Sequence, residues 1–273
     1  MPKLGIFLRN MGPQSTRETL SACAHLADEG TVDDLWLADH VAIPPDQSEG
    51  SNGRYLDPLA TAAYLAAATR RIHFGTGVLV VPYRPALPTA KWIATIQELS
   101  GGRFLFGVGS GWMEPEFKAL GVARNQRGKL TDATLDLVNR AFAGDEVIEN
   151  GQTFLFRPRP PRPPIFVGGS IEVAIPRAAR YGDGWLPTGG DLDKLARGFD
   201  ELRRAFDAAG KTNPELVCMT SLAIDDPKEA VEKARALVKI GATRIVHGER
   251  YADEKRFAAI VRTLDEVRQD LGA

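Results

Sequence analysis

Asp39 and His40 are the neighbouring side chains of this sequence best suited to proton transfer, and they follow a short apolar run that ends at Ala38. A histidine beside a carboxylate can be held in one tautomer and can gain or lose a proton near neutral pH. The same pair could instead cap a helix or form a structural ion pair. The spacing alone leaves both interpretations open.

Two glycine-rich turns suggest a different chemistry, the binding of an anion. The turns Gly109-Ser110-Gly111 and Gly168-Gly169-Ser170 each separate an apolar run from a predicted helix. Glycine lets a ligand approach the backbone, and the free N–H groups of a helix start favour a phosphate. Neither turn matches a dinucleotide or P-loop fingerprint, since Trp112 occupies the last position of the first pattern. Two plain tight turns are therefore the alternative.

The other histidines and the cysteines do not suggest a metal site. His25 falls in a predicted helix and His73 in a predicted strand, whereas His247 ends an apolar run and is a weaker ligand candidate. The four histidines form no H-x-H or H-E-x-x-H pattern. Cys23 and Cys218 stand far apart, so we expect two buried free cysteines and no metal.

The candidate residues named above must be positioned by strands and helices. The sequence predicts both, because short apolar runs alternate with amphipathic stretches. Helix starts are marked at Asp57-Pro58 and Asp226-Pro227, where a capping carboxylate precedes a proline. The predicted strands are mostly apolar on both faces, as in parallel sheets covered by helices. They span residues 4–8, 35–38, 72–81, 104–108, 165–167, 184–187, 216–219 and 244–246.

Eight such strand–helix units in 273 residues predict an α/β fold, a single (β/α)8 TIM-barrel domain spanning residues 1–273. An open doubly wound sheet is the alternative, because periodicity does not show closure. After the fourth unit, Asn150-Gly151 between two alternating runs predicts an inserted β-hairpin. The proline-rich stretch 157–164 then predicts a stiff connector, or alternatively a ligand for a partner protein.

The active site of such a barrel lies at the carboxyl ends of its strands. No lysine stands at these ends and no G-x-S-x-G elbow occurs, which weakens Schiff-base and serine-hydrolase interpretations. The residues found there are polar or glycine: Arg9, Asn10, Asp39, His40, Thr76, Gly77, Gly109 to Gly111, Gly168 to Ser170, Thr188, Gly189, Ser221 and His247 to Glu249.

The charge balance and the hydropathy of the chain argue against nucleic-acid and membrane partners. The chain has 34 basic and 35 acidic side chains, a net charge of -1, which gives no reason to expect nucleic acid or an anionic membrane. No apolar run approaches the roughly 18 residues of a membrane span, and the amino end is too short for a secretory signal. We therefore expect a cytoplasmic protein.

Six segments taken together resemble the bacterial luciferase-like flavin and deazaflavin oxidoreductase superfamily, and the resemblance covers nearly the whole chain. They occur in the expected order over the barrel pattern. The segments are 35–40 (LWLADH), 75–80 (GTGVLV), 90–104 (AKWIATIQELSGGRF), 107–117 (GVGSGWMEPEF), 164–170 (PIFVGGS) and 182–187 (GDGWLP).

The resemblance implies a cofactor whose flavin-like ring lies in the barrel mouth. The phosphate of the cofactor would then be held by Gly168, Gly169 and Ser170. A cis peptide between Gly77 and Val78 would support one face of the ring, and Asp39 and His40 would touch its edge, with His40 as the proton donor. The predicted cofactor-binding set is completed by Val80 and Ser110.

The function implied is hydride transfer between the deazaflavin F420 and a small organic substrate. An FMN-dependent monooxygenase is the alternative, and a barrel that binds a flavin or phosphate ligand without turnover is a third. A separate flavin or F420 reductase would supply reduced cofactor, and a homodimer is expected. Sugar-phosphate dehydrogenases of the family carry a glutamate where Trp112 stands, so alcohol oxidation is doubtful. Glu114 and Glu116, which follow, could face the barrel mouth, but on a short helix we interpret them as solvated or capping residues.

Overall fold

The strands close into a parallel barrel, in a computed structural model that describes residues 1–187, 189 and 191–272. They lie in the order β3-β2-β1-β11-β10-β9-β8-β5-β4, and β3 also pairs with β5, which closes the circle. Because β3 and β4 share one position, the barrel has eight positions, and the predicted fold is confirmed. The bounds are β1 Lys3–Phe7, β2 Asp34–Leu37, β3 His73–Thr76, β4 Leu79–Val80, β5 Phe104–Gly109, β8 Ile165–Gly169, β9 Gly184–Pro187, β10 Glu215–Thr220 and β11 Arg244–His247.

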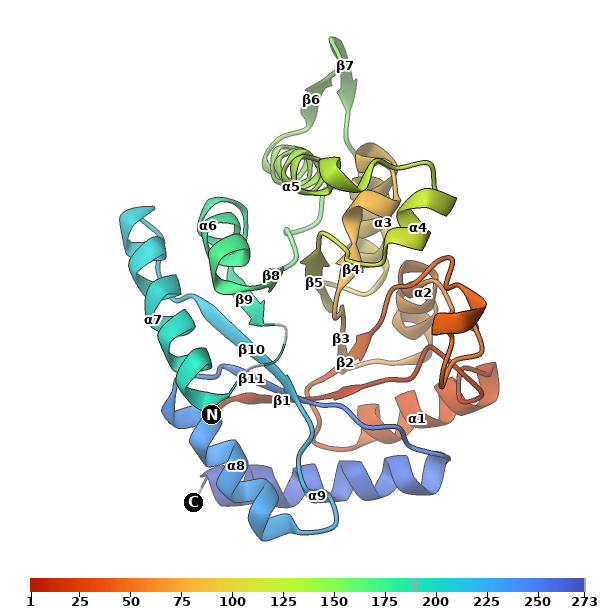
Figure 1. The fold of residues 1–273 in the computed structure, drawn as a ribbon, viewed down its shortest axis with the longest axis vertical. Helices are drawn as coiled ribbons and strands as arrows, with labels where there is room; N and C mark the ends of the chain where they lie inside the picture. The colour runs from red at the N-terminus through yellow and green to blue at the C-terminus, as the bar shows by residue number, and fades with distance from the viewer. Residues whose placement is uncertain (188, 190, 273) are drawn as a thin grey trace.

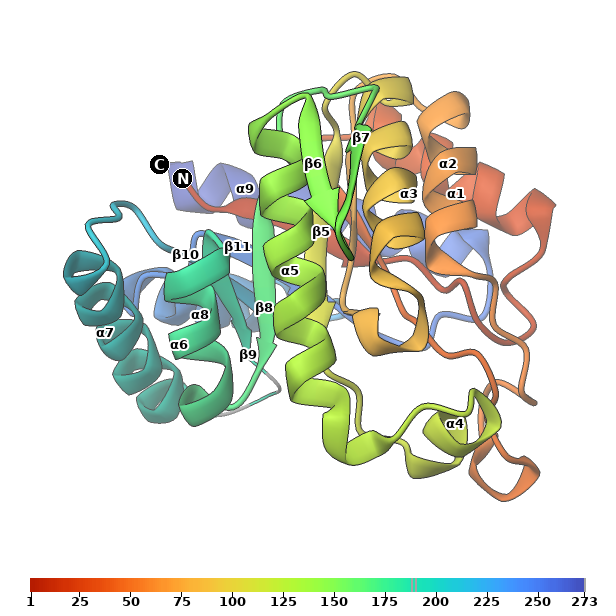
Figure 2. The same ribbon diagram turned by 90° about the horizontal axis from the view of Figure 1, so that it is seen from above.

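Helices surround the barrel (Figures 1 and 2). The α2 helix begins where predicted, since the Asp57 carboxylate accepts hydrogen bonds from the N–H groups of Leu59 and Ala60. The short helix α4 bears Glu114 and Glu116, as expected. The α-helices are α1 Arg17–Glu29, α2 Pro58–Ala68, α3 Ala86–Leu99, α4 Glu114–Ala119, α5 Arg127–Ala143, α6 Ile171–Tyr181, α7 Leu192–Ala208, α8 Pro227–Lys239 and α9 Glu254–Gly272, and 3-10 turns span Pro45–Gln47, Val81–Tyr83 and Arg124–Gln126.

The third strand is broken, whereas the sequence predicted one continuous strand over 72–81. β3 pairs with both β2 and β5, but after Thr76 the chain turns through a cis peptide between Gly77 and Val78. It resumes as β4, which pairs with β5 alone. The break lies at the carboxyl end of the barrel, where it shapes the floor of the site.

The hairpin and the connector occur where predicted. β6 (Glu146–Glu149) and β7 (Gln152–Leu155) pair antiparallel outside the barrel (Figure 1). Their turn residues Asn150 and Gly151 have φ angles of 50° and 77°, the left-handed conformation that a two-residue hairpin turn requires. Residues 157–164 contain no helix or strand and lead directly into β8, which agrees with a connector.

Two apolar layers hold the barrel together. One lies between the strands and the helices and contains both cysteines, which are buried and free as expected. The other fills the inside of the barrel with six buried side chains: Trp36, Leu105, Phe166, Leu186, Val217 and Val246. With its interior packed, the barrel has no through-channel, so a ligand must bind at a rim. Within the residues described, none of the helices is long and apolar enough to cross a membrane.

Candidate active site

A cavity of about 370 Å³ opens at the carboxyl ends of β2, β4, β5 and β8. It brings together all nine predicted site residues, which come from four separate stretches of chain. These are Asp39, His40, Gly77, Val78, Val80, Ser110, Gly168, Gly169 and Ser170. Tyr83, Trp112 and Arg127 also line the cavity and were not among the predicted residues.

The floor of the cavity depends on the break in the third strand. The Gly77–Val78 peptide is cis, as the family resemblance implied. The Val78 side chain fills the space beside Gly109 and Gly168, where added Cβ atoms would lie 2.5 and 2.8 Å from its methyl carbons. The three strand ends therefore meet in a close-packed surface that can support a flat ligand.

His40 does not pair with Asp39, which corrects the predicted arrangement. Its Nδ1 lies 2.9 Å from Oε2 of Glu116. The reason is that Asp39 is already bonded to Arg84 and to the N–H of Val80, whereas α4 brings the Glu116 carboxylate to Nδ1 of His40. His40 is one-fifth exposed, and its ring also contacts Tyr55 and Trp112 edge to face.

Glu116 is fully buried, so interpreting it as a solvated residue was wrong. Its Oε1 accepts hydrogen bonds from the N–H groups of Val41 (2.6 Å) and Ala42 (3.0 Å), and its Oε2 also accepts the hydroxyl proton of Tyr83 (2.8 Å). Burial alone would raise the pKa of this carboxyl, but the hydrogen bonds to Ala42, Val41, Tyr83 and His40 hold it below its usual range. Glu116 is therefore ionised at neutral pH.

Glu114, in contrast, is exposed, as predicted, and contacts Arg124 at 3.3 Å. The sequence contains one weak signal that distinguishes the two glutamates: Glu116 is followed by the apolar Phe117, whereas Glu114 begins the helix. In the structure Phe117 is buried against Tyr83. The partnership with His40 spans 76 residues and has no local signature.

Asp39 binds Arg84, which follows the 3-10 turn Val81–Tyr83. Its carboxylate accepts two hydrogen bonds from Arg84, at 2.7 and 2.9 Å, and one from the N–H of Val80 at 2.8 Å. Arg84 also reaches Asp57 at the start of α2. Burial raises the pKa of Asp39, while the Arg84 guanidinium and the Val80 N–H oppose that shift and favour the carboxylate. The ion pair fixes Asp39 at the cavity wall.

The part of the cavity lined by the turn after β8 has the character of an anion site. Gly169, at φ 135°, turns the chain into Ser170, the N-cap of α6. The indole N–H of Trp185 donates to the Gly169 carbonyl at 2.9 Å and holds this turn in place. The positive end of α6 and the Arg127 guanidinium both favour a negative ligand.

Ser110 connects the first glycine turn to this end. Its hydroxyl lies 3.0 Å from Oγ1 of Thr131 and 3.5 Å from Arg177, which pairs with Asp132 at 2.7 Å. Sequence reasoning missed Arg127 and Arg177, because arginines are frequent on helix surfaces and nothing in the pattern marks these two. Arg127 thus lines the cavity directly, and Arg177 adds a positive charge beside Ser110.

Other predicted candidates lie elsewhere. His247 is buried; its Nδ1 accepts from the N–H of Leu222 at 3.0 Å, and its Nε2 lies 3.2 Å from Glu249. This is a structural arrangement, so the ligand interpretation of His247 was wrong. In the described part of the chain no cluster of histidine, cysteine or acidic side chains could hold a metal ion. Thr188 lies outside the described residues.

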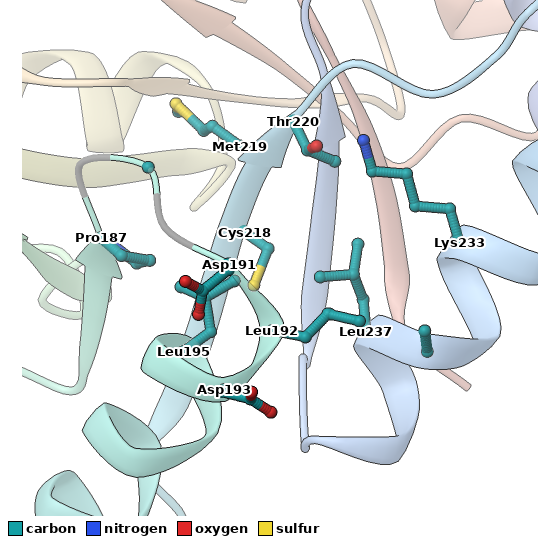
Figure 3. A pocket seen from close by; sticks show the side chains of 12 residues that line it. Pro187, Asp191, Leu192, Asp193, Leu195, Cys218, Met219, Thr220, Lys233 and Leu237 are labelled. Carbon is teal, nitrogen blue, oxygen red and sulfur yellow. The ribbon is translucent and has the colours of Figure 1, made fainter.

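A larger cavity, of about 630 Å³, lies between α7 and α8 (Figure 3). Its apolar side chains come from both helices and from the outward face of β10, among them Leu192, Leu195, Cys218 and Leu237. The predicted site residues do not line it. We therefore place the candidate site at the smaller cavity.

Comparison with known proteins decides the family. Residues 3–272 match the family described as luciferase-like monooxygenase. The chain belongs to this family. An uncharacterized protein of Mycobacterium tuberculosis is 31% identical over 208 residues, 72% of either chain. An FMNH2-dependent dimethylsulfone monooxygenase of Pseudomonas putida is 29% identical over 185 residues, 64% of this chain and 50% of that protein.

Solved structures of luciferase-like enzymes share the fold. The monooxygenase RslO1 from Streptomyces bottropensis superposes with a TM-score of 0.83 at 20% identity, over 99% of this chain and all of that one. An F420-dependent secondary alcohol dehydrogenase, solved with an F420-acetone adduct, gives a TM-score of 0.78 at 16% identity, over 98% of this chain and all of that one. At these identities the likeness concerns the fold alone.

Proposed function

We propose that the protein is an oxidoreductase that transfers a hydride between F420 and a small organic substrate. One observation carries the proposal. A single cavity is lined both by a histidine that is bonded to a buried carboxylate and by a helix start and an arginine, which favour an anion. Hydride transfer to a carbonyl or activated double bond also requires a proton, and His40 is the group placed to supply it.

The residues present fit such a cofactor. The packed surface of Val78 between Gly109 and Gly168 suits a flat ring, and the start of α6 with Arg127 suits a phosphate. Gly168, Gly169 and Ser170 would hold that phosphate, while Asp39, Val80 and Ser110 would line the rest of the site. When bound, F420 supplies the hydride or accepts it.

The chain's own residues perform the remaining tasks. Nδ1 of His40 is hydrogen-bonded to Glu116, which leaves Nε2 as the nitrogen that can exchange a proton with a substrate. Asp39, held by Arg84, would orient the ring edge. Trp112 and Tyr55, which flank His40, would cover a bound substrate and exclude water.

An FMN-dependent monooxygenase is the second candidate. The 29% identity to the dimethylsulfone monooxygenase, which uses FMNH2, favours it. The same cavity would then serve reduced FMN. With either cofactor we propose that a separate reductase supplies the reduced form. We also propose a homodimer that forms through helices α2 and α3, where the aromatic side chains of Tyr64 and Trp92 are exposed.

Titration of the purified protein with F420, FMN and riboflavin, followed by fluorescence, tests the proposal. We expect F420 to bind more tightly than FMN, and riboflavin, which has no phosphate, to bind weakest. Preference for FMN with oxygen consumption after reduction would instead establish the second candidate. Tight binding of a reduced cofactor that no added acceptor reoxidises would indicate a binding protein without turnover.

A further inference from the structure

The contacts of Glu116 account for its whole hydrogen-bonding capacity. A carboxylate has about four acceptor positions. In Glu116 two are used on Oε1 by the N–H groups of Val41 and Ala42, and two on Oε2 by Tyr83 and His40. An ionised carboxylate cannot donate, so the proton between Glu116 and His40 must belong to Nδ1 of His40.

We propose that Glu116 is a positioning residue that fixes His40 with its proton on Nδ1 and its Nε2 free toward the cavity. In the described part of the chain Nε2 of His40 has no hydrogen-bond partner, although the ring lines the cavity. The consequence for catalysis rests on the proposed function, but the tautomer does not.

The position of Glu116 is rigidly determined. Phe117, the next residue, packs edge to face on Tyr83 with ring centroids 5.1 Å apart, and both belong to a small buried cluster with Val80. Gly111, with φ 77°, lets this cluster close, because an added Cβ would lie 2.6 Å from Val80 and 2.9 Å from Phe117. Helix α4 is therefore held in place by this packing, and the four hydrogen bonds hold the Glu116 carboxylate against His40.

Other polar groups near His40 do not compete for Nδ1. Asp39 is occupied by Arg84 and the Val80 N–H. Burial and the hydrogen bond to Glu116 raise the pKa of Tyr83, so its hydroxyl keeps its proton and acts as a donor. Tyr55 contacts the imidazole through its ring, at a centroid distance of 4.9 Å.

The Glu116→Gln substitution separates positioning from a merely structural role. The N–H groups of Val41 and Ala42 still require an acceptor, so the amide oxygen must take the place of Oε1. The NH2 group then takes the place of Oε2, where it can donate to Tyr83 and to His40. His40 must accept at Nδ1, and its proton moves to Nε2. The loop stays anchored while the tautomer reverses.

Nitrogen NMR of the apo protein near pH 8.5, where an ordinary imidazole is neutral, measures this directly. The chain has only four histidines, and a His40→Asn sample assigns the signal. We expect a proton on Nδ1 in the wild type, its transfer to Nε2 in Glu116→Gln, and no change in Glu114→Gln. Glu114 lies on the same helix, but it is exposed.

An unprotonated Nδ1 in the wild type would overturn the proposal, and so would an unchanged tautomer in folded Glu116→Gln. If that variant does not fold, the wild-type spectrum still decides. No cofactor is needed, so failure of the proposed function is seen separately, in the titration. With an active cofactor and substrate, Glu116→Gln should lower kcat by about 10²-fold or more and leave KM within about threefold, as expected for a misplaced proton.

Discussion

At the residue scale, two buried carboxylates have different tasks: Asp39 lines the cavity, whereas Glu116 acts through His40. Asp39 is bound to the permanent cation Arg84, which makes it a fixed part of the wall. Glu116 is bound to backbone N–H groups, a phenol and a titratable imidazole. Only the second carboxylate is coupled to a group that exchanges protons near neutral pH, so His40 and Glu116 form the unit on which turnover should depend.

The His40→Asn substitution tests that dependence. The amide of asparagine can donate to Glu116 as Nδ1 of histidine does, but it does not exchange a proton near neutral pH. We expect turnover to fall by about 10² to 10⁴-fold, since a positioned general acid contributes that much. The free energy of unfolding should change by less than about 1 kcal/mol. His73→Asn, at the exposed start of β3, is the matched control for the rate assay. Full activity of the His40 variant would exclude the catalytic role.

At the element scale, short turns after the strands build the cavity. The turn from β8 into α6 presents a helix start to the cavity, and the break between β3 and β4 provides its floor. Each of these turns contains glycine, whose lack of a side chain lets neighbouring groups or a ligand approach the backbone closely. The substitution of such a glycine should therefore affect cofactor binding more than the fold.

Gly169 is the position that tests this. Gly169→Asp places a carboxylate and a Cβ beside the proposed phosphate position, and we expect cofactor affinity to fall at least about tenfold, or roughly 1.4 kcal/mol. Gly169→Ala is the control, because it shares the left-handed backbone cost at φ 135° but adds no charge. Its added Cβ would meet Ala174 at an ordinary 3.6 Å. Titrations that give equal affinities for both variants and the wild type would place the phosphate elsewhere.

At the scale of the whole molecule, buried polar groups connect neighbouring strands of the barrel. His247 at the end of β11 accepts a hydrogen bond from Leu222, which follows β10. Burial holds the pKa of His247 below 6.5, against the opposing effect of Glu249. The folded barrel thus keeps this ring neutral at a pH at which the unfolded chain would protonate it.

The stability of the protein should consequently depend on pH. Below pH 6.5 the unfolded state binds a proton that the folded state excludes, so the free energy of unfolding should fall as pH decreases, by up to about 1.4 kcal/mol per pH unit for this group. Above pH 6.5 this contribution is fully present. The free energy of unfolding, measured with urea between pH 7.5 and 5, should change less steeply with pH in His247→Asn than in the wild type. It should change as in the wild type in His25→Asn, where the histidine is exposed. Equal slopes in all three proteins would assign the pH dependence to other groups.

The sequence by itself determined the eight strand–helix units, the hairpin, and the polar and glycine residues at the strand ends, but it left the closure of the barrel open. These follow from local patterns: apolar runs of strand length, caps such as Asp57, the Asn150-Gly151 turn, and glycine turns at strand ends. The rule that parallel strands share one carboxyl end then brought the chosen residues to one rim. The cis peptide at Gly77 was expected only from the family resemblance.

Only the tertiary structure decided which side chains pair. Adjacency in the sequence suggested Asp39 as the partner of His40, but Asp39 is bonded to Arg84 instead. The true partner, Glu116, comes from a helix 76 residues away, and the burial that makes it a positioning group is created by packing of Phe117 on Tyr83. Arg84 reaches Asp39, and Arg127 reaches the cavity, in the same way. Long side chains acquire such partners through packing between distant segments, and no local pattern records that packing.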